Sequence, residues 1–184
     1  MAAIPPVCDF GLKAPDFRLK GTDGSMHGLQ DLKGPKGTVI AFICNHCPYV
    51  QTILDGLIQD AKDLAAIGVA TIAICSNDAT AYPEDGFEEM VELAGRKQFP
   101  FPYLHDQSQE VAQSYGAICT PDFFGYNADL ELQYRGRLDA SGKAGSPGAK
   151  RELVLAMREV ALTGQGPRDQ TPSIGCSIKW KHAA

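Results

Sequence analysis

The hydrophobic pattern in the central part of the chain predicts a β-α-β unit. Residues 38–43 (TVIAFI) and 69–75 (VATIAIC) are continuous apolar runs rich in β-branched side chains, a pattern typical of strands buried on both faces. Between them, apolar residues from Cys47 to Leu64 recur at the spacing of one helix face. We therefore expect two central, parallel strands joined by a helix through a right-handed crossover.

The flanking segments predict further strands and helices. Residues 16–29, with Asp23-Gly24 at their centre, are typical of a β-hairpin, and residues 122–126 and 130–135 predict a second one. The remaining elements are expected to be a helix at 87–94, a short strand at 101–104, a short helix between Ser108 and Gly116, and a last helix at 153–161. This order of elements indicates a layered α/β domain with a mixed sheet.

Composition and charge narrow the class of protein. The chain has 184 residues, 44% of them hydrophobic and 21% charged, which suits one domain with its own core. The net charge of −5 offers no basic stripe for a phosphate backbone, and we expect no nucleic-acid partner. The N-terminal segment has neither a basic region nor an apolar run long enough for a signal peptide or a membrane span. We therefore expect a cytoplasmic protein with no membrane partner.

Two of the six cysteines, Cys44 and Cys47, stand close together in the sequence. They fall where the first buried strand gives way to the helix, and the N–H groups and dipole of that helix are expected to favour the Cys44 thiolate. Cys47 is expected in the first helical turn, near enough to form a disulfide, with Cys44 attacking and Cys47 resolving. His46 lies between them and is expected to tune the balance between thiolate and disulfide.

These residues resemble the active-site segment of the thioredoxin-like superfamily, in which a CxxC motif opens a helix of a β-α-β unit. The resemblance covers roughly residues 14–162 and is strongest to the redoxin branch, which joins peroxiredoxin-like AhpC/TSA proteins and membrane-anchored thiol-disulfide reductases. It implies a three-layer fold with a mixed central sheet, helices on both faces and an N-terminal β-hairpin. Residues 45–50 (NHCPYV) and 173–181 (SIGCSIKWK) resemble a subgroup described as thioredoxin-like or as thiol-disulfide isomerases.

Residues 115–127 (YGAICTPDFFGYN) resemble the segment of this family that carries a cis-proline. The resemblance places this proline at Pro121. It implies that the Thr120–Pro121 bond is cis and faces the CxxC pair, where the Thr120 backbone pairs with a substrate polypeptide. Asn45, inside the CxxC motif, joins Thr120 and Pro121 as a candidate substrate-binding residue.

We divide the chain into a leader (1–13), a thioredoxin-like redoxin domain (14–162) and a C-terminal tail (163–184) that docks on the domain. The apolar residues of the tail favour docking over free disorder. Cys176, in this tail, either resolves a disulfide when the tail covers the site or belongs to a segment that merely covers a core edge. Cys119 is either a buried strand-edge thiol or a second accessory thiol.

The function expected is thiol-disulfide exchange with protein disulfide or dithiol substrates. A second protein or a low-molecular-weight thiol would donate electrons. No Gly-rich phosphate loop is present, and we expect no organic cofactor and no metal.

Three other functions compete with this prediction. A peroxiredoxin-like thiol peroxidase would use the same cysteines, but neither fits the Pro-x-x-x-Thr/Ser-x-x-Cys pattern. Gly37 and Ala41 stand at the Pro and Thr/Ser positions for Cys44, and Ile40 and Cys44 stand there for Cys47. A zinc module would need four thiolates, which Cys44, Cys47, Cys119 and Cys176 could supply. A non-enzymatic binding domain on the same scaffold is the third alternative.

Overall fold

A computed structural model describes residues 2–6, 8–146 and 148–181. Its main sheet contains, in spatial order, β3 (Met26–Gly28), β2 (Arg18–Gly21), β6 (Tyr103–His105), β5 (Val69–Cys75), β4 (Gly37–Phe42), β8 (Asp122–Asn127) and β9 (Leu132–Tyr134). The strands β4 and β5 are parallel and lie at the centre, as the continuous apolar runs predicted. The antiparallel pairs β2–β3 and β8–β9 confirm the two predicted hairpins and make the sheet mixed.

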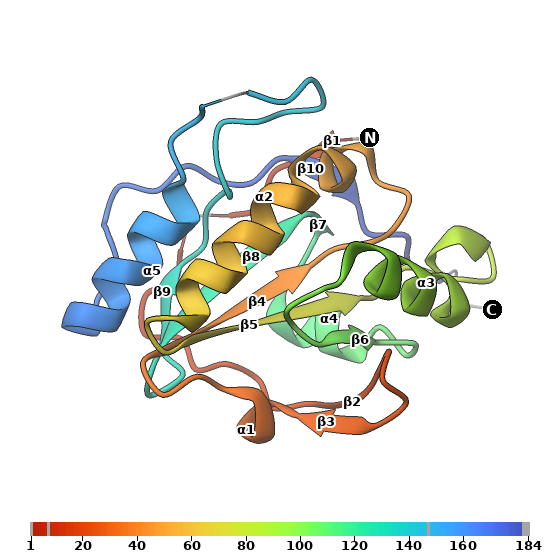
Figure 1. The fold of residues 1–184 in the computed structure, drawn as a ribbon, viewed down its shortest axis with the longest axis horizontal. Helices are drawn as coiled ribbons and strands as arrows, with labels where there is room; N and C mark the ends of the chain where they lie inside the picture. The colour runs from red at the N-terminus through yellow and green to blue at the C-terminus, as the bar shows by residue number, and fades with distance from the viewer. Residues whose placement is uncertain (1, 7, 147, 182–184) are drawn as a thin grey trace.

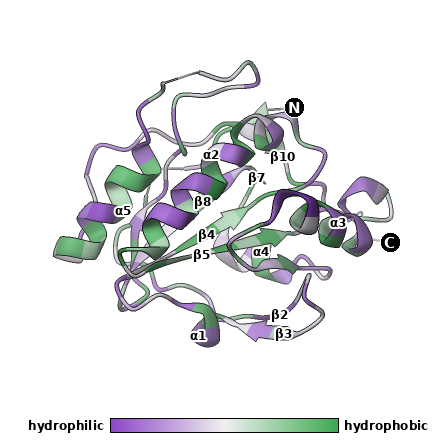
Figure 2. Ribbon diagram, in the orientation of Figure 1, coloured by the Kyte–Doolittle hydropathy of each residue, from purple (hydrophilic) through white to green (hydrophobic). Residues whose placement is uncertain are grey.

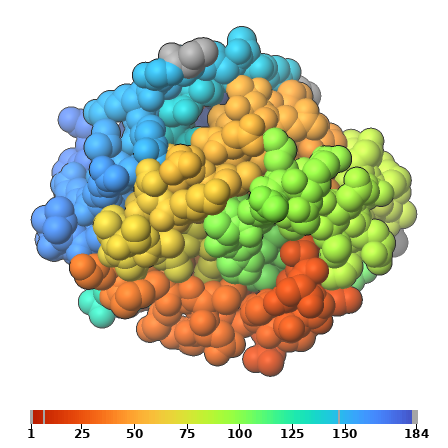
Figure 3. Space-filling view, in the orientation of Figure 1, coloured from red at the N-terminus to blue at the C-terminus, as the bar shows by residue number. Residues whose placement is uncertain are grey.

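Helices cover both faces of this sheet (Figure 1). The helices α2 (Pro48–Ala65), α3 (Phe87–Lys97) and α5 (Glu152–Thr163) contribute buried residues to the core on one face, whereas α1 (Leu29–Leu32) and α4 (Glu110–Tyr115) contribute to the core on the other. Figure 3 shows the first three side by side over the sheet. The arrangement is a three-layer α/β fold.

The alternation of side chains along β4 divides the core between the two faces. Val39 and Ala41 point to the α2 side, while Ile40 and Phe42 point to the α4 side. All four are buried, which explains why the strand is an unbroken apolar run rather than an alternating one. Figure 2 shows this apolar centre beneath helices whose outward faces are polar.

Strands from the N-terminal and C-terminal segments pair beside the start of α2. The C-terminal strand β10 (Gly175–Ser177) pairs antiparallel with β7 (Cys119–Thr120) on one edge and with β1 (Ala2–Ala3) on the other. The segment predicted as a leader also packs on the domain, because the Gly11 amide donates to the Leu132 carbonyl of β9 and the Leu132 amide donates to the Leu12 carbonyl. No helix in the described ranges is long and apolar enough to cross a membrane.

Two elements after β5 differ from the sequence-based expectation. The N-cap of α4 is Gln109 rather than Ser108, and the buried carboxylate of Asp106 accepts the amides of Val111 and Ala112 in its first turn. A 3₁₀ turn, η1 (Pro83–Asp85), follows β5 where the sequence indicated only a break.

Candidate active site

The CxxC motif occupies the connection from β4 to α2. Cys44 follows the end of β4 by two residues, and Cys47 is the N-cap of α2, which begins at Pro48. Proline suits this first helical position because its missing N–H would have no partner within the helix. Both cysteines are free and almost fully buried, with 1% of Cys44 and 0% of Cys47 exposed. The structure therefore shows a reduced, enclosed pair.

The Thr120–Pro121 bond is cis, as the resemblance implied, and Thr120 touches both cysteines. Its hydroxyl oxygen Oγ1 lies 3.3 Å from the Cys44 sulfur, and its carbonyl accepts a hydrogen bond of 3.1 Å from the Cys47 thiol. The cis-proline segment and the CxxC motif are 73 residues apart along the chain and form one site.

The electrostatics of the pair favour the thiolate at Cys47. A hydrogen bond from Cys44 lowers the pKa of Cys47, and the nearby backbone N–H groups of Val50 and Cys176 add to this effect against the cost of burial. The same hydrogen bond raises the pKa of Cys44, as do burial and the negative charge of Asp85. The structure places Cys47, rather than Cys44, at the N-cap of α2, and which of the two sulfurs attacks stays a prediction.

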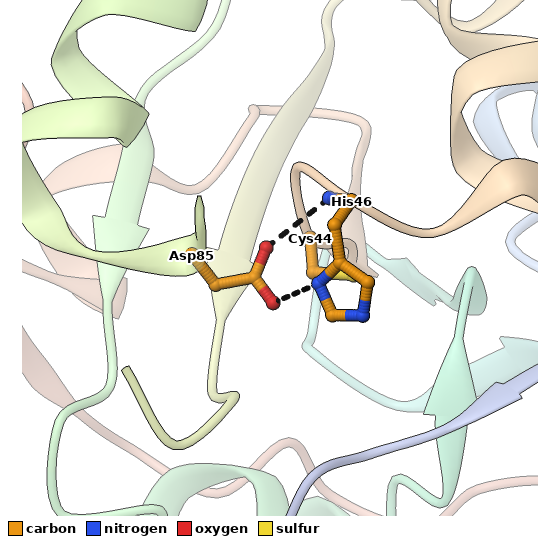
Figure 4. Close-up of side chains that lie close together, drawn as sticks. All are labelled: Cys44, His46 and Asp85. Carbon is orange, nitrogen blue, oxygen red and sulfur yellow. Dashed lines mark hydrogen bonds and ion pairs between the residues drawn. The ribbon is translucent and has the colours of Figure 1, made fainter. Parts of the chain in front are cut away.

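Asp85 is the functional residue that the sequence did not reveal. It lies in η1, is fully buried, and accepts the backbone N–H groups of Asn45 at 2.7 Å and His46 at 3.2 Å through Oδ1. Its Oδ2 accepts the imidazole Nδ1–H of His46 at 2.6 Å (Figure 4). The same oxygen accepts the side-chain amide of Asn77 at 2.7 Å. The carboxylate thereby fixes the backbone and the histidine between the two cysteines. No local pattern marks Asp85, since the CxxC residues that it binds, His46 and Asn45, lie 39 and 40 residues away.

His46 is held on two sides. Besides its bond to Asp85, its ring stacks on Tyr82 with centroids 5.2 Å apart and an interplanar angle of 5°. Asn45, a candidate substrate-binding residue, uses its side-chain amide within the protein. It donates to the Glu84 carbonyl at 2.8 Å and accepts the Tyr103 hydroxyl at 3.0 Å. Asn45 therefore braces the active-site loop.

The C-terminal tail covers the cis-proline segment. In the pairing of β10 with β7, Cys176 stands opposite Thr120. The backbone edge of Thr120 that was expected to bind a substrate polypeptide is thus occupied by the protein's own strand. The approach is close, because a Cβ atom on Gly175 would collide with the Thr120 carbonyl.

The remaining cysteines differ in their relation to the pair. Cys119 is buried in β7, and its thiol donates to the Pro121 carbonyl at 3.4 Å. Cys75 is buried at the end of β5, and burial raises its pKa to about 12. Cys8 packs partly buried against the core on the α4 side. Cys176 is partly buried and stands opposite Thr120, whose carbonyl accepts the Cys47 thiol.

Potential metal ligands gather at one place in the part of the chain that the structure describes. One group of three, Cys44, His46 and Asp85, has ligand atoms within 4.8 Å of one another. In this group the Asp85 carboxylate already accepts the His46 ring N–H. The four-cysteine set suggested by the sequence is not among such groups in those residues.

Known structures share this fold. An uncharacterized conserved protein from Geobacillus kaustophilus is 44% identical, with a TM-score of 0.94 over 100% of this chain and 98% of that chain. A thiol:disulfide interchange protein of the thioredoxin family from Chlorobium tepidum TLS is 19% identical, with a TM-score of 0.58 over 73% of this chain and 90% of that chain. The second similarity shows the fold alone. The thioredoxin-like fold predicted from the sequence is confirmed.

Sequence comparison identifies the family. The AhpC/TSA family matches residues 10–140. A protein of Coxiella burnetii (strain RSA 493 / Nine Mile phase I) named "Putative peroxiredoxin bcp" is 27% identical over 117 residues, which are 64% of this chain and 72% of that protein. The chain belongs to the AhpC/TSA family.

Proposed function

We propose that the protein is a thiol-disulfide oxidoreductase whose redox unit is the Cys44–Cys47 pair. The observation that carries this proposal is that both thiols contact Thr120, the residue before the cis-proline, while Cys47 immediately precedes α2. Two thiols at this spacing, one of them with a lowered pKa, suit a pair that cycles between dithiol and disulfide.

The chemistry follows the unequal pKa values of the pair. Cys47, as the thiolate, attacks a disulfide sulfur, and Cys44 then supplies the second thiol that closes the Cys44–Cys47 disulfide. These roles reverse those expected from the sequence. A thiolate stabilised by its surroundings favours the reduced protein and therefore makes the couple more oxidising.

The substrates proposed are protein disulfides and dithiols, with a second protein or a small thiol as electron donor. A groove of about 90 Å³ beside Pro121 supports a polypeptide substrate. Its walls include Tyr49 and Ile53 of α2 and Ile174 of the tail, which offer apolar contacts for a substrate side chain.

A thiol peroxidase is the second candidate, because the Coxiella burnetii relative is named as a peroxiredoxin and the Thr120 hydroxyl stands beside Cys44. Peroxide reduction needs a thiolate, however, and the pKa of Cys44 is raised by its bond to Cys47, by burial and by Asp85. The Cys47 thiol donates to the Thr120 carbonyl, and the Thr120 side chain also lowers its pKa. These contacts favour disulfide exchange.

The test is turnover with a protein disulfide. Insulin reduction with glutathione as donor should fall about a hundredfold or more in Cys44→Ser and in Cys47→Ser, while Cys8→Ser should match the wild type. Consumption of hydrogen peroxide is followed in parallel. Wild-type turnover in both active-site variants would refute the proposal, and peroxide reduction far faster than insulin reduction would establish the peroxidase.

A further inference from the structure

A third thiol stands at the edge of the active site and is more open to solvent than the other two. Cys44 and Cys47 are 1% and 0% exposed. Cys176 is only partly buried, and it packs against the same core cluster as the pair. A reagent in solution therefore meets Cys176 before it meets either cysteine of the CxxC motif.

Cys176 is held against Cys47 rather than against Cys44. It stands opposite Thr120, whose carbonyl accepts the Cys47 thiol, and it packs against the cluster that contains Cys47. The backbone N–H of Cys176 also lowers the pKa of Cys47. Cys47 also interacts with Cys44. The central sulfur of the three is thus Cys47, which can exchange disulfide bonds with either neighbour.

The position of Cys176 is set by the fold. The pairing of β10 with β7 places it opposite Thr120, and the neighbouring Gly175 allows the two backbones to approach closely. Beyond β10, the tail remains fixed because the Lys179 amide donates to Asn77 at 2.8 Å and the Lys181 amide to Gln109 at 2.8 Å. Strand pairing on both sides and these anchors keep the thiol at the site.

From these contacts, and on the basis of the proposed function, we propose that Cys176 is the entry thiol of a three-cysteine relay and carries disulfide exchange between external thiols or disulfides and the enclosed Cys44–Cys47 pair.

The steps conserve atoms and electrons. The Cys176 thiol, whose pKa is raised by burial and by the neighbouring Cys47, loses its proton and attacks an external disulfide R–S–S–R, forming Cys176–S–S–R and releasing one RS⁻. The Cys47 thiolate attacks the Cys176 sulfur, forming the Cys47–Cys176 disulfide and releasing the second RS⁻. The Cys44 thiol loses its proton and attacks Cys47, which closes Cys44–Cys47 and returns Cys176 as a thiol. The external disulfide is reduced by two electrons, the pair is oxidised by two, and reduction by a donor thiol reverses the same steps.

The relay intermediate can be identified by disulfide mapping. Trypsin places Cys44 and Cys47 together in the peptide 37–62 and Cys176 in the peptide 169–179, and only a disulfide to Cys176 links the two. After oxidation with excess oxidised glutathione and acid quenching, Cys44→Ser should give this cross-link, whereas Cys47→Ser should not. Absence of the cross-link in Cys44→Ser, or an equal amount in Cys47→Ser, would overturn the proposal.

Kinetics separate the relay from the proposed function. Reduction of the oxidised enzyme by glutathione should be about tenfold slower in Cys176→Ser than in the wild type, because attack must reach a buried disulfide. Cys8→Ser, which removes the other partly buried cysteine, should react at the wild-type rate. An unchanged or faster rate in Cys176→Ser would overturn the relay while leaving the pair's function intact. Failure of the wild type and Cys176→Ser to form Cys44–Cys47 would instead refute the proposed function.

Discussion

The imidazole of His46 is bound to the buried carboxylate of Asp85, with Nδ1 2.6 Å from Oδ2 (Figure 4). The bond makes Nδ1 the donor and leaves the other ring nitrogen of a neutral imidazole as an acceptor. The same carboxylate accepts the backbone amides of Asn45 and His46. One side chain therefore sets the orientation of the histidine and the path of the backbone between the two cysteines.

Removing the charge of Asp85 should destabilise this loop. In Asp85→Asn, an amide N–H₂ group faces donors that now bind a carboxylate oxygen, and the free energy of unfolding should fall by about 3 kcal/mol. Urea denaturation measures the change. Glu84→Gln, at the adjacent exposed side chain, is the matched control and should cost less than about 0.5 kcal/mol. Equal stability of Asp85→Asn and the wild type would contradict the bracing role.

The thiolate absorbance of the reduced protein should titrate well below the ordinary cysteine pKa of about 8.5, because Cys47 accepts a hydrogen bond from Cys44. Cys47→Ser should abolish this early phase, and Cys44→Ala should move it to higher pH by removing the donor. Persistence of the phase in Cys47→Ser would assign the thiolate to another cysteine.

The lowered pKa also predicts how stability depends on pH. A group that loses its proton more readily in the folded state contributes stability that is complete above the unfolded pKa and is lost as pH falls through the folded pKa. The unfolding free energy of reduced wild type, minus that of Cys47→Ser, should therefore increase between the lowered pKa and about pH 9. Denaturation at several pH values gives this difference, and a flat or falling curve would contradict the assignment.

Arg135 should be essential for stability because it neutralises a buried charge. Its Nη2 lies 3.2 Å from Asp122, which is 1% exposed and has a pKa raised by burial to about 6. Arg135→Met should cost about 3–5 kcal/mol at pH 7, and the loss should shrink at lower pH as Asp122 takes up a proton.

Two further variants check this explanation. Adding Asp122→Asn to Arg135→Met should restore part of the stability, since the unpaired charge is removed. Arg137→Met, at a more exposed ion pair with Glu152, should cost about 1 kcal/mol or less. Thermal unfolding that shows no rescue in the double variant would mean that packing over Phe124, rather than charge, explains the role of Arg135.

Gly175→Ala should loosen the tail, because its Cβ would collide with the Thr120 carbonyl. The buried thiols of the pair should then be alkylated faster by iodoacetamide, by about tenfold or more under native conditions. Gly142→Ala adds a methyl group in open space and should leave the rate unchanged. Equal alkylation rates in the two variants would show that β10 does not protect the pair.

The fold could be predicted largely from the sequence because its central strands leave a strong local signal. The run 69–75 coincides with β5, and 38–43 differs from β4 by one residue at each end. Both strands are buried on both faces, which requires continuous apolar residues. The strands β1, β7 and β10 have two or three residues each and were not predicted, since their existence depends on long-range pairing.

The site could be predicted only where a motif marks it. Cys44, Cys47 and Pro121 follow from the CxxC spacing and the family resemblance. The role of Asp85 depends on how η1 approaches the loop, and the position of Cys176 against Cys47 depends on the register of β10. The position of Cys47 at the N-cap of α2 was also out of reach, because it depends on where the helix starts to within one residue.

The most direct test of the central claim is to map disulfides at equilibrium in glutathione redox buffers, counting free thiols by mass spectrometry. We expect an intramolecular Cys44–Cys47 disulfide that forms with a single potential, between about −270 mV for a thioredoxin-like reductant and about −120 mV for a strong oxidant. If the wild type forms no Cys44–Cys47 disulfide at any ratio of reduced to oxidised glutathione, the pair is not a redox unit and the proposed function is wrong.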